Sequence, residues 1–344
     1  MKCTFTIAER FCLVLDSDSQ DSIYNYFNKE YSDFINYKDN YLSIIGELRE
    51  INKADILDPH RFELVNNWLF EEKESLIVKY ANKYIRIKLN ENSFLIEYEY
   101  HFEKKVIFFV TEVLIRIYSF KFGIDFFHAS SFRYQNKVYM LNGFGGSGKT
   151  EIMVDFLLNG AEFISDDLVI INEEGKLFPY RVNIPIRWKA ISEDFIKKID
   201  VSPKIYNICK FTKNKTNRLA QSIHSRFAWK YILGDYSHEQ LTDKDAALKY
   251  YTVDKCLWLQ EANFVGPFDF SNADFFRYMN LCLQNESRKY FDLEGFLMLK
   301  FPFLKNFIKE RENLRKKICS KFDIKGFAIQ NGDFSSVINF LKKN

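Results

Sequence analysis

The run Gly143-Phe144-Gly145-Gly146-Ser147-Gly148-Lys149-Thr150 constrains the fold of this chain more than any other feature. Its glycines permit backbone angles that aim successive N–H groups inward, which makes an anion site that continues into a helix N-terminus. The alternating stretch Lys-Val-Tyr-Met-Leu-Asn precedes the run, and Glu151 to Asn159 carries an apolar face at helical spacing after it. A strand, a glycine-rich loop and a helix in this order predict a phosphate-binding P-loop.

The last two residues of the run give the expected ligand. In a P-loop the lysine, here Lys149, reaches the β- and γ-phosphates of a nucleotide, and the hydroxyl of Thr150 ligates Mg²⁺. We therefore expect the eight residues from Gly143 to Thr150 to bind ATP or another nucleoside triphosphate. The alternative is a glycine-rich turn with a solvated lysine, and the flanking strand and helix argue against it.

Two neighbouring acids, Asp166 and Asp167, interrupt an otherwise mostly apolar stretch, Glu162 to Ile171, that we predict to be a strand. Carboxylates in such a strand are costly unless a cation meets them, and Mg²⁺ on the triphosphate is that cation. Because strand neighbours point to opposite faces, we expect separate roles, one acid holding the metal through water and the other accepting a hydroxyl proton. The alternative is a pair that only ends a strand.

His128 begins a segment that reads as a β-hairpin, with Gln135-Asn136 as its two-residue turn. Counting outward from that turn pairs His128 with Gly143, at the entrance of the P-loop. An imidazole there could tune a neighbouring acid or donate a hydrogen bond to a phosphate. A structural histidine at the start of a strand is the alternative.

Basic residues offer further phosphate or acceptor contacts. Arg187 lies in Ile184-Pro185-Ile186-Arg187-Trp188, and residues 201 to 230 contain seven Lys or Arg and no acid. These side chains could close over phosphates or bind an acidic acceptor, although a solvated face is the alternative reading.

The bulk composition bounds the class of protein. A chain of 344 residues with 47% hydrophobic residues is long enough for two domains, which we expect at 1–122, mostly β, and at 123–344. A net charge of +3 argues against nucleic acid or an anionic membrane as the main partner. The six cysteines form no CxxC pair, and no segment has the pattern of a signal peptide or a membrane span. We expect a cytoplasmic protein, and a homo-oligomer is compatible with the sequence.

Residues 123 to 190 resemble the HPr kinase/phosphorylase family of bacteria, whose P-loop domain is akin to phosphoenolpyruvate carboxykinase. The resemblance is carried by His128 on a hairpin, the P-loop with the acid Glu151 after its hydroxyl residue, and Asp166-Asp167 one short helix later. It implies a mixed-sheet α/β (α+β) kinase domain, with His128 in the active site, Lys149 on the phosphates and Asp167 as the base. We assign the metal to Thr150 and Asp166, and we count Glu151 with Arg187 among candidate phosphate or acceptor contacts.

The expected function is an ATP-dependent, Mg²⁺-requiring kinase that phosphorylates a hydroxyl of a protein, a peptide or a small molecule. One alternative is a nucleotide-binding regulatory module without phosphotransfer. Another is a carboxykinase-like enzyme acting on a small organic acid, for which residues 201 to 230 could supply a carboxylate pocket.

Overall fold

The computed structural model describes residues 2–7, 11–17, 22–31, 42–56, 63–64, 69–72, 74–180, 250–288, 293–330, 332 and 334–343. These residues form a mixed α/β protein with two compact units. The first unit comprises Met1–Phe126, Ile170–Glu174 and Asn280–Lys321, and the second comprises Phe127–Val169, Gly175–Met279 and Phe322–Asn344. Arg187 and the basic stretch at 201–230 lie outside the described residues.

The first unit contains an eight-stranded sheet in the order β1-β2-β3-β8-β7-β6-β5-β4. β3 pairs in parallel with β2 and β8, and the other neighbours are antiparallel. Along the strand Lys83–Leu89, Ile85, Ile87 and Leu89 are buried while Arg86 and Lys88 between them are not, so one face belongs to the core. The strands are β1 (Lys2–Ile7), β2 (Phe11–Ser17), β3 (Leu42–Ile51), β4 (Glu63–Leu64), β5 (Leu69–Glu72), β6 (Ser75–Tyr80), β7 (Lys83–Leu89) and β8 (Ser93–Glu99).

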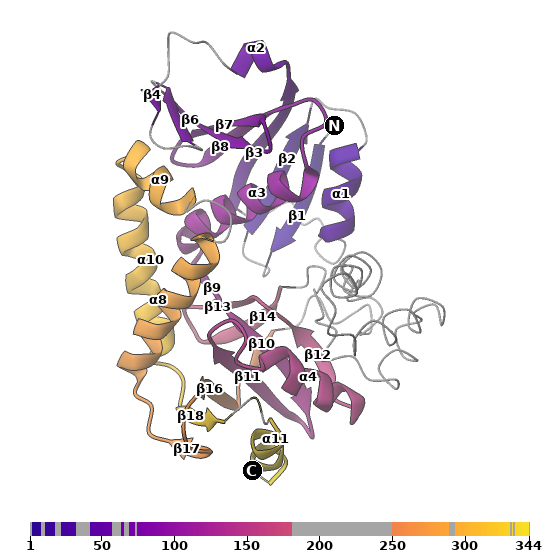
Figure 1. Ribbon diagram of the computed structural model, residues 1–344, viewed down its shortest axis with the longest axis vertical. Helices are drawn as coiled ribbons and strands as arrows, with labels where there is room; N and C mark the ends of the chain where they lie inside the picture. The colour runs from indigo at the N-terminus through magenta and orange to yellow at the C-terminus, as the bar shows by residue number, and fades with distance from the viewer. Residues whose placement is uncertain are drawn as a thin grey trace, which may run out of the picture. The chain divides into compact units, whose positions relative to one another are not determined.

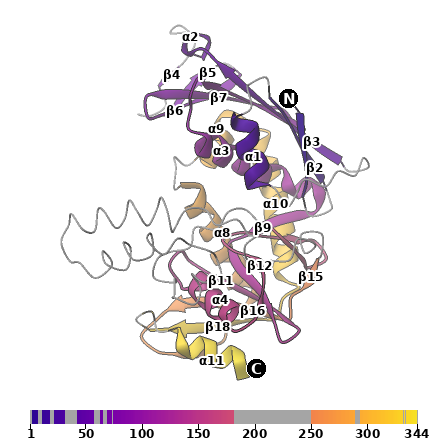
Figure 2. The same ribbon diagram turned by 90° about the vertical axis from the view of Figure 1, so that its right-hand side faces the viewer.

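Helices α1 (Ser22–Glu30) and α3 (Lys104–Tyr118) lie against this sheet (Figures 1 and 2). The stretch from Lys104 to Phe122, which carries apolar residues at helical spacing, is helical, and its last turn is the 3₁₀ helix η2 (Ser119–Phe122). The ring of Phe108 on α3 contacts Phe27 and Tyr31 at 5.3 and 5.0 Å between centroids, which joins α1 to α3. The unit also contains α2 (Lys53–Ile56), α9 (Leu293–Lys300), α10 (Leu304–Cys319) and the end of α8 (Asn272–Arg288).

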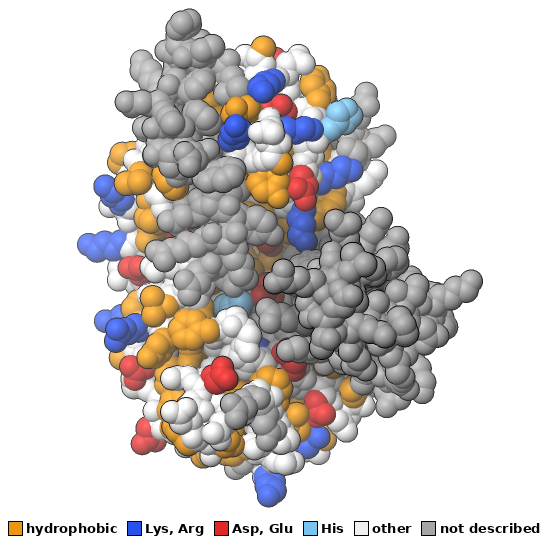
Figure 3. Space-filling model, in the orientation of Figure 1, with side chains coloured by type: hydrophobic (Ala, Val, Ile, Leu, Met, Phe, Trp, Pro, Cys, Tyr) orange, Lys and Arg blue, Asp and Glu red, His pale blue; other side chains and the backbone are white. Residues whose placement is uncertain are grey.

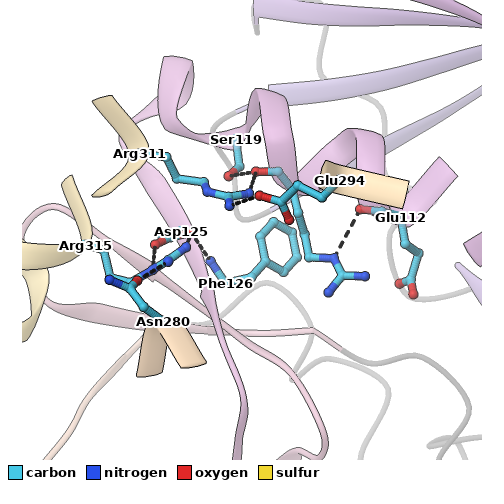
Figure 4. Close-up of polar contacts among 9 residues, drawn as sticks. Glu112, Ser119, Asp125, Phe126, Asn280, Glu294, Arg311 and Arg315 are labelled. Carbon is cyan, nitrogen blue, oxygen red and sulfur yellow. Dashed lines mark hydrogen bonds and ion pairs between the residues drawn. The ribbon is translucent and has the colours of Figure 1, made fainter. Parts of the chain in front are cut away.

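A buried group of charged side chains fixes strand β9 (Ile124–Phe127) to helices of the first unit (Figure 4). Arg315 on α10 donates to Asp125 on β9 through Nε and Nη2, at 2.5 and 3.0 Å, and also donates to the side chain of Asn280. Arg311, one turn earlier on α10, pairs with Glu294 of α9. Burial alone would raise the pKa of Glu294, but the Arg311 charge and hydrogen bond lower it overall.

The second unit contains a six-stranded mixed sheet in the order β12-β10-β11-β16-β18-β17. β11, β16 and β18 are parallel neighbours, and β12, β10 and β17 pair antiparallel. The apolar runs Leu257-Trp258-Leu259 and Gly326-Phe327-Ala328-Ile329 lie in β16 and β18. The strands are β10 (Ala129–Tyr134), β11 (Lys137–Gly143), β12 (Glu162–Ser165), β16 (Lys255–Glu261), β17 (Gly266–Phe268) and β18 (Ile324–Ile329).

One face of this sheet is covered by α4 (Lys149–Leu158) and α11 (Ser335–Lys343), which share an apolar core with β10, β11, β16 and β18. Gly160, which has φ +89°, lies just beyond the end of α4. The N–H groups of Gly160 and Ala161 donate to the carbonyls of Leu157 and Phe156, which is a Schellman motif. The motif stops the helix and turns the chain directly into β12.

A four-stranded sheet has the order β15-β14-β13-β9, and the turn at residues 173–175 joins β13 to β14. β9 is the neighbour of β13 (Val169–Asn172), and β14 (Lys176–Pro179) pairs antiparallel with β15 (Tyr251–Thr252) in the second unit. Acidic and basic side chains are interspersed over the described surface in Figure 3. Among the described residues, no helix is both long and apolar enough to cross a membrane.

Candidate functional site

The hairpin that leads into the P-loop has the predicted register. Gln135 and Asn136 form its turn with φ of +49° and +62°, as a type I′ turn requires, and Tyr134 pairs with Lys137. The ladder continues without a slip to Ala129 and Asn142. His128, the residue before β10, is therefore held at the end of the hairpin from which the P-loop departs.

The P-loop leaves β11 at Gly143 and enters α4 at Lys149, as predicted. The Lys149 side chain is buried, and its Nζ donates to the carbonyls of Gly143 and Phe144 at 2.8 and 3.2 Å. These contacts hold the ammonium group within the loop itself. The aromatic ring of Phe144 packs edge-on against Trp258 of β16 and Tyr278 of α8, which fastens the loop to the sheet.

Asp166 is buried beside the start of α4. Its residue exposure is 5%, and its carboxylate accepts hydrogen bonds from the hydroxyls of Thr150 and Ser130. The Thr150 Oγ1 lies 3.0 Å from Oδ2 and 3.2 Å from Oδ1. Burial raises the pKa of Asp166 to about 6, an effect that the neighbouring charge of Asp167 increases and the two hydroxyls and Lys149 oppose.

The predicted strand from 162 to 171 is wrong at its centre, because Asp166 and Asp167 form a bend between β12 and β13. Asp167 has φ +66°, and the Leu168 N–H donates to the Asp166 carbonyl across it at 2.8 Å, closing a three-residue turn. The Ser165 hydroxyl lies 2.6 Å from the Leu168 carbonyl and 2.8 Å from that of Tyr180. The side chains of Asp166 and Asp167 therefore point in different directions because the backbone turns between them, and not because they alternate along a strand.

The turn gives Asp167 surroundings opposite to those of Asp166. Its side chain is 49% exposed, and its Oδ1 lies 3.6 Å from Nδ1 of His128, whose own side chain is 4% exposed. The structure thus brings His128 and Asp167 together, as well as Thr150 and Asp166. The charges of Asp167 and Lys149 both act on the carboxyl of Asp166, so the two pairs and Lys149 are neighbours.

Ser130 is the residue of this site that we did not predict. It lies on β10 opposite Leu141, on the face that packs against α4, and its hydroxyl donates to Asp166 Oδ1. The alternation of β10 could have revealed this orientation, since Phe132 two residues later is an obvious core residue of the same face. The sequence contained no signal for the partner of the hydroxyl.

The donors present suit Mg²⁺. Thr150 and Asp166 offer a hydroxyl and a carboxylate, and Mg²⁺ in nucleotide sites is commonly held by one or two carboxylates together with phosphates and water. Among the described residues, no group of three or more His, Cys, Asp or Glu could hold a metal ion without help from nucleotide phosphates. The raised pKa of Asp166 also indicates a buried carboxylate that a nearby cation would stabilise in its charged form.

Of the remaining candidates, Glu151 lies half-buried in the first turn of α4. Arg187 falls outside the described residues, so its suggested phosphate contact stays a prediction. No protein-family model matches the chain, and the search of curated proteins finds no significant match. The assignment of the site therefore depends on its own geometry.

Replacing Gly148 by alanine should disrupt the P-loop. Gly148 has φ +85°, and an added Cβ would lie 2.0 Å from the ring of Phe334, the residue before α11. We expect Gly148→Ala to lower the free energy of unfolding by about 1–3 kcal/mol through backbone strain and this clash. Gly145→Ala is the matched control, because a Cβ there meets nothing within 4 Å. Urea unfolding would measure both variants, and equal midpoints would contradict the expected close packing.

Proposed function

We propose that this protein is an ATP-dependent kinase that requires Mg²⁺ and transfers the γ-phosphate to a hydroxyl group of a protein, peptide or small-molecule acceptor. The observation that carries the proposal is the difference in burial and contacts between two neighbouring acids, Asp166 and Asp167. Asp166 is buried against the P-loop hydroxyl of Thr150, whereas Asp167 is half-exposed beside His128. A metal-associated carboxylate and an accessible carboxylate next to the phosphate loop are what phosphoryl transfer to a hydroxyl requires.

The residues of the site support an in-line displacement. The N–H groups of the P-loop and the ammonium of Lys149 would bind the phosphate oxygens, with the loop glycines allowing close approach. When bound, Mg²⁺ would supply positive charge that offsets the negative charge developing on the phosphates. Thr150 and Asp166 are the residues that would hold it. Most of the acceleration would come from positioning and charge stabilisation.

Asp167 is the proposed base. Its carboxylate would accept the proton of the acceptor hydroxyl while the freed oxygen bonds to the γ-phosphorus and the bond to the β–γ bridging oxygen breaks, releasing ADP. His128, at 3.6 Å, would orient the carboxylate and stabilise its charge when the imidazole is protonated. Asp tolerates left-handed backbone better than most residues, so the turn at φ +66° is compatible with this side chain.

The resemblance in residues 123 to 190 supports a finer proposal for the fold, namely a mixed-sheet P-loop kinase domain of the HPr kinase and phosphoenolpyruvate carboxykinase type. We also propose a cytoplasmic location, where ATP and Mg²⁺ are supplied. The buried thiol of Cys319, which forms no disulfide with a described residue, suits a reducing compartment.

The decisive variant is Asp167→Asn, since Asn also tolerates the left-handed turn and keeps the volume of the side chain. The protein, γ-labelled ATP, Mg²⁺ and a bacterial lysate would be incubated, and label followed into protein, peptide and metabolite fractions. We expect label in an acceptor with the wild type and a loss of about 10²–10⁴-fold with Asp167→Asn, the typical contribution of a general base. ATP affinity should change little.

Asp269→Asn is the control, because it changes an exposed Asp of the same unit to the same residue. It should transfer phosphate like the wild type. Tight ATP binding by all three proteins with no transfer from any of them would refute the kinase and favour a nucleotide-binding regulatory module. Label confined to a small organic acid would instead favour a carboxykinase-like enzyme.

A further inference from the structure

The hydroxyl of Ser130 occupies an unusual position beside the proposed metal site. Ser130 is fully buried on β10, and its Oγ donates to Oδ1 of Asp166, a residue 36 positions later in the chain. A carboxylate only accepts hydrogen bonds, so the Ser130 proton must point at Asp166. The contact therefore fixes one of the two carboxylate oxygens.

The Ser130 contact also affects the hydroxyl of Thr150. Its Oγ1 lies almost equally far from both oxygens of Asp166, at 3.0 Å from Oδ2 and 3.2 Å from Oδ1. A hydroxyl that ligates a cation turns a lone pair toward it and has one proton left to donate. Because Oδ2 is the nearer oxygen and Ser130 already donates to Oδ1, the Thr150 proton is directed to Oδ2, and the lone pairs of Thr150 are turned away from the carboxylate.

We propose that Ser130 is a positioning residue, which sets the orientation of the Asp166 carboxylate and, through it, of the Thr150 hydroxyl that would bind Mg²⁺. This inference rests on the proposed Mg²⁺–ATP site and deepens it. Hydrogen bonds that orient metal ligands typically account for about 10–100-fold in metal affinity. Loss of the Ser130 hydroxyl should therefore weaken the Mg²⁺ dependence of nucleotide binding while leaving the metal-free interaction of ATP with the P-loop unchanged.

Ser131 provides a matched control within the same strand. It is also fully buried, it is chemically identical, and its side chain points to the opposite face of β10. Its Oγ has no hydrogen-bond partner among the described residues. Ser131→Ala thus removes an equally buried hydroxyl without touching Asp166.

The test is calorimetric titration of ATP into the full-length protein across a series of Mg²⁺ concentrations, together with Mn²⁺ binding followed by electron paramagnetic resonance. For Ser130→Ala we expect the Mg²⁺ concentration at the midpoint of ATP binding, and the Mn²⁺ dissociation constant, to rise about tenfold or more. For Ser131→Ala we expect both values to equal those of the wild type. Ser130→Cys keeps the side chain nearly the same size and replaces the hydroxyl with a weak donor, so a smaller shift in the same direction is expected even if the alanine variant unfolds.

The outcomes separate the two levels of inference. A Mg²⁺ midpoint within about twofold of the wild type for Ser130→Ala or for Ser130→Cys, with the wild type showing Mg²⁺-dependent ATP binding, would overturn the role of Ser130 and leave the kinase proposal intact. A purely structural role would move the urea midpoint alone. Wild-type protein that shows no Mg²⁺ dependence at all would refute the proposed site, and the role of Ser130 with it.

Discussion

Replacing Asp166 by asparagine should make the metal-free protein more stable and at the same time abolish its response to Mg²⁺ and ATP. Burial raises the pKa of this carboxyl from 3.8 to about 6, so the folded protein at neutral pH contains a carboxylate that its surroundings disfavour. The amide in Asp166→Asn carries no charge, and its carbonyl oxygen can still accept a hydrogen bond from Ser130. We expect a gain of about 1–3 kcal/mol at pH 8 in EDTA.

The pH dependence gives the sign of this effect. Between about pH 4 and pH 6 the folded state of the wild type holds a proton on Asp166 that the unfolded state has released, so the contribution of this group to stability falls as the pH rises. Below about pH 4 both states are protonated, and above about pH 6 the penalty is complete. Asp166→Asn removes this component, so the difference in unfolding free energy between variant and wild type should grow from about pH 4 to pH 6 and then level off.

Adding Mg²⁺ and ATP should reverse the order of stabilities. A ligand at about a hundred times its dissociation constant stabilises the folded protein by about 2.7 kcal/mol, and the wild type should gain this increment while Asp166→Asn should not. Urea unfolding at pH 5 and pH 8, with EDTA or with Mg²⁺ and ATP, would measure the four cases. Asp269→Asn, on the surface of the same unit, should track the wild type throughout. A metal-free Asp166→Asn protein that is less stable at pH 8 would show that the carboxylate carries no such penalty.

The hairpin and the order of strand, glycine-rich loop and helix around Gly143 to Thr150 could be predicted because their determinants are local. The two-residue turn at Gln135-Asn136 determines the register of β10 and β11, and the apolar face over Glu151 to Asn159 indicates α4. The bend at Asp166 and Asp167 could not be predicted in this way, since apolar residues continue on both sides of it. Its backbone is held by Ser165, whose hydroxyl contacts Tyr180 fifteen residues away.

Contacts between segments that are distant in the chain could not be predicted from the sequence either. Ser130 has no sequence pattern that distinguishes it from Ser131, and only the packing of β10 against α4 and β12 makes one of them a neighbour of Asp166. Similarly, local sequence does not say which element a helix of the C-terminal third packs against. Asn280–Lys321 belongs to the first compact unit, although it follows most of the second in the chain.

The largest loss of stability should follow the removal of Arg315. Its guanidinium and the Asp125 carboxylate are only 3% and 1% exposed, and the two hydrogen bonds between them are bidentate. Burial alone would lower the pKa of Arg315, but Asp125 outweighs it and raises the pKa overall. Arg315→Ala would leave Asp125 as a buried, uncompensated charge, and we expect the free energy of unfolding to fall by about 3–5 kcal/mol.

A second pair on the same helix supplies the control. Lys317 of α10 pairs with Glu173 at 2.8 Å, but the two side chains are 56% and 44% exposed, so Lys317→Ala should cost less than about 1 kcal/mol. The double variant Arg315→Met with Asp125→Leu removes both buried charges and should recover much of the loss, because apolar replacements of a buried ion pair are often tolerated. Urea unfolding followed by circular dichroism would compare the three proteins. If Arg315→Ala and Lys317→Ala had similar effects, the buried pair would contribute no more to stability than a surface ion pair.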